Sequence, residues 1–166
     1  RLTSRRGRDE TVRYPDLLAD LAALGCRNAV LDGEIVVLDP GGAPSFGLLQ
    51  PRINLTRPAD IAAAAAQAPA QLLLFDVLRL DDEALMRRPY EERRQLLEGL
   101  HPASGSRVQV PPEFEGDLEA ALDASEAFRL EGVVAKRRGS VYQPGARART
   151  WLKIKHRRSQ SVVVGG

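Results

Sequence analysis

Lysine is nearly absent from this basic chain, which otherwise uses arginine for its positive charge. Only three of the 24 lysine and arginine residues are lysine, and they lie late in the sequence, at Lys136, Lys153 and Lys155. Arginine presents a planar fork of donors, whereas lysine is a compact point charge that suits a single phosphate oxygen. The clustering therefore favours an anion-binding function for these lysines, with chance clustering in an arginine-rich composition as the alternative.

Cysteine and long apolar runs are also scarce. Cys26 is the single cysteine, which excludes an internal disulfide and is typical of a reducing compartment. No apolar run is long enough to cross a bilayer and no signal peptide is recognisable, so we expect a cytoplasmic protein without a membrane partner. With 166 residues, 43% of them hydrophobic, the chain is long enough for one globular domain.

The positive charge is concentrated near the end of the chain. The net charge is only +2, but residues 129–158 contain ten lysines and arginines and a single acidic residue, Glu131. A segment of this kind is typical of proteins that bind a phosphate-bearing partner.

Residues 150–157, TWLKIKHR, alternate in the manner of a β-strand. Alternation places Leu152 and Ile154 toward the core, and Trp151, Lys153 and Lys155 on the opposite face. Two ammonium groups side by side on one face repel each other, so the pair favours an anion such as phosphate between them. A solvent-exposed strand face is the alternative.

A second strand is predicted over residues 130–136, LEGVVAK. It places Glu131 on one face and Lys136 on the other. Because Mg²⁺ is often held by one or two carboxylates together with substrate phosphates, Glu131 is a candidate metal ligand beside the lysines. Arg149 lies six residues before Lys155 and is expected to reach the same anion.

Residues 28–42 predict another strand, ended by a Pro-Gly-Gly turn. Asp32 and Glu34 share one face of it, and two carboxylates in an otherwise apolar strand are costly to bury without partners. Glu34 is therefore a candidate for binding ribose hydroxyls or a metal. A strand end at which the carboxylates meet solvent or a salt bridge is the alternative.

The apolar run at residues 71–80, QLLLFDVLRL, predicts a strand buried on both faces. Phe75 is its only aromatic residue, and it either stacks on a base or packs in the core. Near the start of the chain, Gly7 lies among arginines, and a turn there would offer Arg5 and Arg6 to a phosphate. An exposed basic turn is the alternative for this segment.

Local signals predict where the helices begin. Proline in a first helical turn predicts one helix after Tyr14 and another from Pro89. Ser45, Asp60 and Asp117 are expected to cap three further helices.

Five stretches of the chain resemble the ordered motifs of covalent nucleotidyltransferases. They are SRRGRD (4–9), LDGEIV (31–36), LLLFDV (72–77), LEGVVAK (130–136) and WLKIK (151–155). The chain is most similar to bacterial ATP-dependent DNA ligases of the end-joining type, and SFGLLQ, PYEERRQLL and EFEGD also resemble that subgroup. The resemblance covers almost the whole chain, and five motifs in the right order are far more specific than any one of them.

The resemblance implies an α+β adenylation (nucleotidyltransferase) domain, with antiparallel sheets flanked by helices and the nucleotide in a groove between them. It implies that Phe75 stacks on adenine, that Glu34 binds the ribose, and that Glu131, with Glu34, holds a metal. The ATP contacts implied besides these are Arg5, Arg149, Lys153 and Lys155, and the DNA contacts are Arg6 and Lys136. ATP and Mg²⁺ or Mn²⁺ are the implied cofactors.

The reaction implied is a relay of AMP through a lysine. The lysine of a KxDG motif attacks the α-phosphate of ATP and releases pyrophosphate, AMP passes to a DNA 5′-phosphate, and the 3′-hydroxyl then displaces AMP. No KxDG occurs in this chain, so we predict that it is inactive alone. We expect residues 1–158 to be a partial adenylation domain lacking its N-terminal part. Residues 159–166 are expected to be a linker and the start of an oligonucleotide-binding (OB-fold) domain.

The expected partners are nicked or broken double-stranded DNA, in the bacterial nucleoid, and a DNA end-binding protein. Strands missing from the sheet would leave an unpaired edge, which predicts low stability and self-association. Two other functions remain open from the sequence. One is a non-catalytic module that binds nucleotide or DNA, and the other is an RNA ligase or a capping guanylyltransferase.

Overall fold

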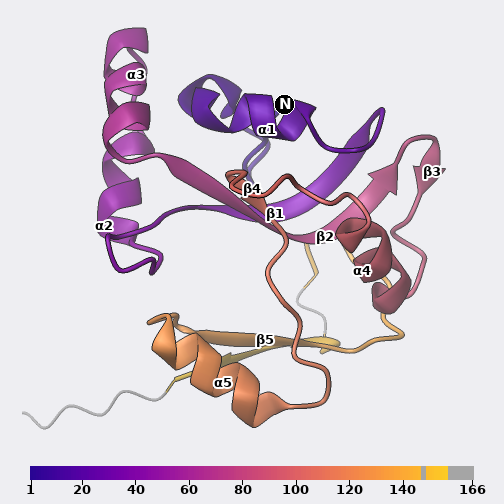
Figure 1. Ribbon diagram of the computed structural model, residues 1–166. Helices are drawn as coiled ribbons and strands as arrows, with labels where there is room; N and C mark the ends of the chain where they lie inside the picture. The colour runs from indigo at the N-terminus through magenta and orange to yellow at the C-terminus, as the bar shows by residue number, and fades with distance from the viewer. Residues whose placement is uncertain (147–148, 157–166) are drawn as a thin grey trace, which may run out of the picture.

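The computed structural model describes residues 1–146 and 149–156 and shows two β-sheets with helices around them (Figure 1). The larger sheet contains β1 (Ala29–Val37), β2 (Ala70–Leu80), β3 (Glu83–Ala84) and β4 (Val108–Gln109), and the smaller contains β5 (Gly132–Lys136) and β6 (Trp151–Lys155). The α-helices are α1 (Leu18–Ala22), α2 (Phe46–Leu49), α3 (Pro58–Gln67), α4 (Tyr90–Glu98) and α5 (Leu118–Ala127), and the 3-10 helices are η1 (Thr11–Arg13), η2 (Pro15–Leu17) and η3 (Gln50–Arg52). Paired strands are antiparallel except β4, which runs parallel to β2, so the predicted α+β architecture is confirmed.

Local capping determines where several helices begin. Ser45 accepts a hydrogen bond from a backbone amide of α2, and Asp117 accepts one of 2.8 Å from a backbone amide of α5, as predicted. The prediction for Asp60 is wrong, because α3 begins at Pro58 and Asp60 lies within its first turn. Proline suits the first helical position, where an amide hydrogen has no partner in the helix. Among the helices of the described segments, none is long and apolar enough to cross a membrane.

The strand β2 is less uniformly buried than its apolar sequence predicts. Its register with β1 shifts after Asp32, so that Phe75 has no partner in the ladder. Leu72 and Leu74 are buried in the main core, whereas Leu73 and Phe75 are only half-buried. The prediction of a strand buried on both faces is therefore wrong, because the second face of β2 lies toward the smaller sheet (Figure 1).

The main core packs the larger sheet against α1, α4 and the turns that precede α1 (Figure 1). Its buried hydrophobic residues are Tyr14, Leu17, Leu24, Ala70, Leu72, Leu74, Val77, Leu85, Leu97, Leu100 and Val108. Removing this apolar surface from water is the main force that holds the larger sheet to its helices.

Two ion pairs are buried beside the core. Arg52 donates two hydrogen bonds of 2.8 Å to Asp16, and Arg93 donates two, of 2.8 and 2.9 Å, to Asp76. Burial alone would raise the pKa of Asp16, but hydrogen bonds from Arg52 and from the Ala70 amide outweigh it and hold the pKa below its ordinary value. Each arginine donates to both oxygens of its carboxylate. A buried carboxylate needs such a partner, because it would otherwise lose its hydration without compensation. The Arg93 pair thereby fastens α4 to β2.

In the smaller sheet, Gly132 lies opposite Lys155 and Lys136 lies opposite Trp151. Directly opposed residues share a face, so Trp151 and all three lysines lie on the side of the larger sheet, and α5 lies on the other side (Figure 1). Leu152 is 55% exposed, which contradicts its predicted place in a core, because α5 covers only part of its face. Residues 159–166, expected to begin a further domain, lie outside the described residues.

Candidate functional site

Lys153, Lys155 and Glu131 form a cluster at one end of the smaller sheet, which we call the lysine–glutamate cluster. Nζ of Lys153 lies 2.9 Å from Oε2 of Glu131, and Nζ of Lys155 lies 3.6 Å from the same atom. The hydrogen bond from Lys153, followed by the charges of both lysines, holds the pKa of Glu131 below its ordinary value. All three side chains are exposed. A phosphate can therefore reach the two ammonium groups and replace the carboxylate as their partner.

Lys136 lies at the opposite end of the strand pair, among three aromatic side chains. Its Nζ is 4.1 Å from the ring centroid of Trp151, 4.5 Å from that of Tyr90 and 5.3 Å from that of Phe75. It also donates a 2.9 Å hydrogen bond to the carbonyl of Phe75, a residue of β2 that has no partner in β1. We call these four residues the aromatic box.

Burial dominates the electrostatics of Lys136. It lowers the pKa of Lys136 to about 8, because the ammonium group loses hydration there. The carboxylates of Asp76 and Asp32 oppose this shift, whereas the charges of Arg94 and Arg93 add to it. The aromatic faces around Nζ also favour the charged form. The balance leaves an ammonium whose charge depends on pH just above neutrality.

A further contact joins the larger sheet to the loop that precedes β6. The hydroxyl of Tyr142 donates a 2.7 Å hydrogen bond to Oδ2 of Asp32 on β1. The Tyr142 ring meets Trp151 edge to face at 5.8 Å, and Tyr90 of α4 does so at 6.3 Å. Trp151, the first residue of β6, is therefore held by tyrosines from two separate elements.

Several residues of this arrangement are not predicted from the sequence. Asp76 carries one usable signal, because a carboxylate inside an apolar run requires a cationic partner, which the structure identifies as Arg93. Tyr90 stands at a helix start and Tyr142 stands in a loop rich in glycine and proline. Neither position has a periodicity that would indicate contact with Trp151.

The remaining predicted site residues lie on the larger sheet and in the turn near the start of the chain. Glu34 is exposed on β1, and Arg5 and Arg6 are exposed in the turn at Gly7. Within the described part of the chain, no hydrogen bond or ion pair joins any of these three to the lysine–glutamate cluster. Their roles stay predictions.

Arg149 and Lys155 lie at opposite ends of β6. Arg149 is exposed in the turn before the strand, and Lys155 is its last residue. A strand of this length separates its first and last residues by about 13 Å. An anion that contacts both side chains must therefore extend along the strand, and the contact of Arg149 with the same anion stays a prediction.

The described residues contain no group of three or more His, Cys, Asp or Glu side chains placed to hold a metal ion. A nucleotide-bound Mg²⁺ requires only one or two carboxylates in addition to phosphates. Glu131 fits this role if Lys153 and Lys155 bind phosphate in place of its carboxylate, because the carboxylate is then free for a metal. Glu34 lies on the other sheet, so its share in such a site stays a prediction.

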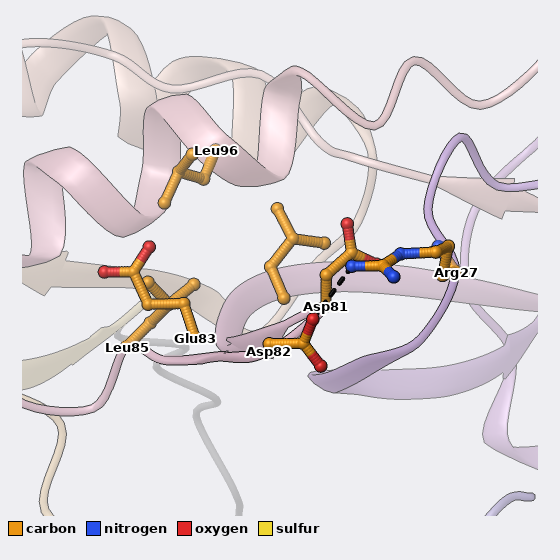
Figure 2. A pocket seen from close by; sticks show the side chains of 7 residues that line it. Arg27, Asp81, Asp82, Glu83, Leu85 and Leu96 are labelled. Atoms are coloured by element: carbon orange, nitrogen blue, oxygen red, sulfur yellow. Dashed lines mark hydrogen bonds and ion pairs between the residues drawn. The ribbon is translucent and has the colours of Figure 1, made fainter.

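Among the open hollows on the surface of the described residues are two of similar volume. One, of about 460 Å³, is lined by Arg129, Leu130, Glu131, Lys155 and His156 and therefore adjoins the lysine–glutamate cluster. The other, of about 510 Å³, lies at the β2–β3 turn; Figure 2 shows Arg27, Asp81, Asp82, Glu83, Leu85 and Leu96 around it. Arg27 pairs with Asp82 at 2.9 Å in this larger hollow, which contains no predicted site residue. The smaller hollow is the one relevant to phosphate binding.

Two sheets that face each other, with helices outside and clustered lysines on the inner face, define an α+β domain of the nucleotidyltransferase class. Residues 1–155 match the family model of the ATP dependent DNA ligase domain. The chain belongs to this family.

Relatives and solved structures agree with the family. The multifunctional non-homologous end joining protein LigD of Mycobacterium bovis is 44% identical over all 166 residues, which cover 20% of that protein. A probable DNA ligase of Streptomyces griseus is 37% identical over 94% of this chain and 32% of its own length. A structure of mycobacterial DNA ligase D complexed with ATP and MES has a TM-score of 0.74 and 42% identity, covering 94% of this chain and 47% of that one. The ligase domain of M. tuberculosis LigD has a TM-score of 0.73 and 44% identity, covering 94% and 48%.

The chain spans about a fifth of the mycobacterial relative and a third of the Streptomyces relative. What those longer proteins do as a whole therefore applies to this chain only as a proposal.

Proposed function

We propose that this chain is the nucleotide-binding part of an ATP-dependent DNA ligase that joins broken DNA. The observation that carries the proposal is the lysine–glutamate cluster, in which two exposed lysines share one carboxylate in a chain of the ligase family. Two further observations support it. One relative is named for non-homologous end joining, and one similar structure is of a ligase complexed with ATP.

In this proposal the triphosphate of ATP lies along β6. Lys153 and Lys155 leave Glu131 and bind phosphate oxygens, because a triphosphate offers more negative charge than one carboxylate. Arg149, in the turn before β6, and Arg5, in the turn at Gly7, add further phosphate contacts. A divalent cation, Mg²⁺ or Mn²⁺, held by the released Glu131 together with Glu34, would neutralise further phosphate charge.

The base and ribose lie toward the larger sheet. Phe75 stacks on adenine from the half-buried face of β2, and Glu34 accepts hydrogen bonds from the ribose hydroxyls. Arg6 contacts the DNA backbone near a nick or break that an end-binding protein presents. Lys136 is engaged by the Phe75 carbonyl, so the DNA contact predicted for it requires that its ammonium leave the aromatic box.

The chemistry is transfer of AMP in three steps. A lysine amine attacks the α-phosphorus of ATP and pyrophosphate leaves; the DNA 5′-phosphate then takes AMP from the lysine; the 3′-hydroxyl finally displaces AMP and the strand is sealed. The residues of this chain contribute charge stabilisation at phosphorus. The attacking lysine belongs to a KxDG motif that this sequence does not contain. The chain alone should bind ATP without becoming labelled.

Calorimetric titration of the chain with ATP and Mg²⁺ tests binding, and denaturing electrophoresis after incubation with α-labelled ATP tests covalent transfer. We expect binding that weakens at least about tenfold in Lys153→Ala and Lys155→Ala, since each removes a charge-assisted contact. Arg27→Ala, in the other hollow, is the matched control. Retained covalent label would overturn the claim that the chain is inactive alone, and absence of ATP binding would overturn the proposed function.

Two alternatives are separated by simple comparisons. Preference for GTP over ATP, or for RNA ends over DNA ends, would favour a capping enzyme or an RNA ligase. A start codon directly before Arg1 would favour a non-catalytic binding module, whereas a KxDG encoded upstream would favour a ligase.

A further inference from the structure

The lysines of β6 are carried by a strand that has little support of its own. Its only strand neighbour among the described residues is β5, and the side chains of Val134 and Leu152 in this pair are 52% and 55% exposed. A two-stranded sheet is marginally stable in water without further packing. Something beyond the pair must therefore fix where Lys153 and Lys155 lie relative to the larger sheet.

Trp151 supplies that support at the first residue of β6. It contacts Lys136 of β5, Tyr90 of α4 and Tyr142 of the preceding loop. Two of the three also bond to the larger sheet: Lys136 donates to the Phe75 carbonyl on β2, and the Tyr142 hydroxyl donates to Asp32 on β1 at 2.7 Å.

Tyr142 is itself placed firmly at both its backbone and its side chain. Its amide donates a 2.9 Å hydrogen bond to the carbonyl of Met86, and the guanidinium of Arg93 lies 5.9 Å from its ring centroid. Burial and the hydrogen bond to the Asp32 carboxylate raise the pKa of Tyr142, so the hydroxyl stays protonated and keeps donating.

We propose that Tyr142 is a positioning residue whose hydrogen bond to Asp32 sets the distance between β1 and β6. β1 carries Glu34 two residues after Asp32, and β6 carries Lys153 two residues after Trp151. The contact therefore holds β6, and with it Lys153 and Lys155, in the position that phosphate requires, so its loss should weaken the binding of phosphates and not of the nucleoside alone. This inference rests on the proposed function, because it assigns the phosphate-binding role to Lys153 and Lys155.

Tyr142→Phe tests the inference, because it removes the hydroxyl and keeps the ring against Trp151. We expect the affinity of the chain for ATP and for inorganic tripolyphosphate to fall about tenfold, as expected for one hydrogen bond to a charged group. The affinity for adenosine should not change. Tyr14→Phe, which removes a hydroxyl in the main core, is the matched control and should change none of the three affinities.

Variants of Asp32 test the same hydrogen bond from its acceptor side. Asp32→Asn keeps an acceptor oxygen for the Tyr142 hydroxyl. It should therefore retain most of the tripolyphosphate affinity, whereas Asp32→Ala should lose it. Tyr142→Phe combined with Asp32→Ala should be no weaker than either alone, because both remove the same contact. Trp151 is the only tryptophan, so its emission should shift in Tyr142→Phe and not in Tyr14→Phe.

The outcomes separate this inference from the proposed function. Equal losses for adenosine and tripolyphosphate, additive losses in the double variant, or an unchanged Trp151 emission would overturn the positioning role. Failure of the wild-type chain to bind ATP while it binds tripolyphosphate would overturn the proposed function, and the tripolyphosphate and fluorescence measurements would still decide the role of Tyr142. Failure to bind either probe would overturn both.

Discussion

Among single residues, Lys136 makes the aromatic box sensitive to pH. Its ammonium lies 4.1 Å from the ring of Trp151, the only tryptophan. Because burial lowers the pKa of Lys136 to about 8, a positive charge beside the indole disappears just above neutral pH. We expect tryptophan emission to titrate with a midpoint near this value and the transition to vanish in Lys136→Met. A midpoint at 10.5, the ordinary lysine value, would show that the ammonium is not desolvated.

The same shift links Lys136 to folding stability. The unfolded chain, in which the lysine keeps its ordinary pKa of 10.5, binds the proton more strongly than the folded chain, in which the pKa is about 8. Burial of the charged lysine therefore lowers the free energy of unfolding by its full amount below pH 8. The free energy of unfolding then rises as the pH increases from about 8 to 10.5. Urea unfolding of wild type and Lys136→Met at neutral and alkaline pH should reveal a gain for wild type of at most about 3 kcal/mol. The two proteins share every other titrating group, so a difference that does not change with pH would contradict the shift.

Gly132 is required by a close approach of two backbones. Its φ is +145°, and a Cβ there would lie 2.0 Å from the carbonyl oxygen of Ile154 and 2.7 Å from Cα of Lys155. Gly132→Ala should therefore separate β5 from β6, lower the free energy of unfolding by about 3 kcal/mol or more and abolish ATP binding. Gly139→Ala, whose Cβ meets no atom within 4 Å, should change stability by only about 0.5 kcal/mol. Thermal unfolding of the two variants checks this, and similar losses in both would contradict it.

At the scale of elements, one buried arginine joins α4, β2 and the loop before β6. Arg93 donates to the Asp76 carboxylate and, at 3.1 Å, to the Ser140 carbonyl, and neither side chain of the Arg93–Asp76 pair is exposed. Arg93→Met leaves a buried carboxylate without its partner and should cost about 3–5 kcal/mol in chemical unfolding. Arg88→Met, which breaks only exposed ion pairs with Glu83 and Glu92, should cost about 1 kcal/mol or less.

A double variant decides whether charge burial is the reason. Arg93→Met together with Asp76→Leu removes both charges and should recover part of the stability that Arg93→Met loses. If the double variant is less stable than Arg93→Met, the role of Arg93 is packing rather than the pairing of a buried charge.

Elements set by neighbouring residues can be predicted from the sequence. Ser45 and Asp117 cap their own helices, and the strand that carries Lys153 and Lys155 follows from alternation within a few residues. The failure at Asp60 is also local, since Pro58 begins the helix two residues earlier. Burial of β2 could not be predicted in this way, because its second face lies toward the smaller sheet, whose strands come much later in the chain.

The contacts that assemble the candidate site join residues far apart in the sequence. Lys136 and Phe75 are separated by 61 positions, and Tyr142 and Asp32 by 110. Motif resemblance identifies Phe75, Lys136 and the cluster residues as a group, but it does not give the contacts among them. The half-buried place of Lys136 follows from three rings contributed by β2, α4 and β6, which no local pattern encodes.

Considered as a whole, the molecule has one long strand edge that other strands can reach. Within the described residues β1 pairs with no strand other than β2, so its opposite edge offers amide and carbonyl groups for pairing, except at Val37, whose carbonyl accepts a hydrogen bond from Ser45. Val30 on this strand is 50% exposed. Because exposed apolar edge strands pair with one another, we expect the chain to self-associate reversibly as its concentration rises in sedimentation velocity.

A charge on the edge should oppose that association, and its position separates strand pairing from general repulsion. Val30→Lys places an ammonium on β1 and should weaken association by at least about tenfold, since edge lysines are unfavourable for strand addition. Val12→Lys adds the same charge at a side chain that is 74% exposed in η1, away from the sheet, and should have little effect. If both variants weaken association equally, net charge rather than the β1 edge controls it. A wild-type chain that stays monomeric at every concentration would contradict the prediction that the β1 edge pairs with another chain.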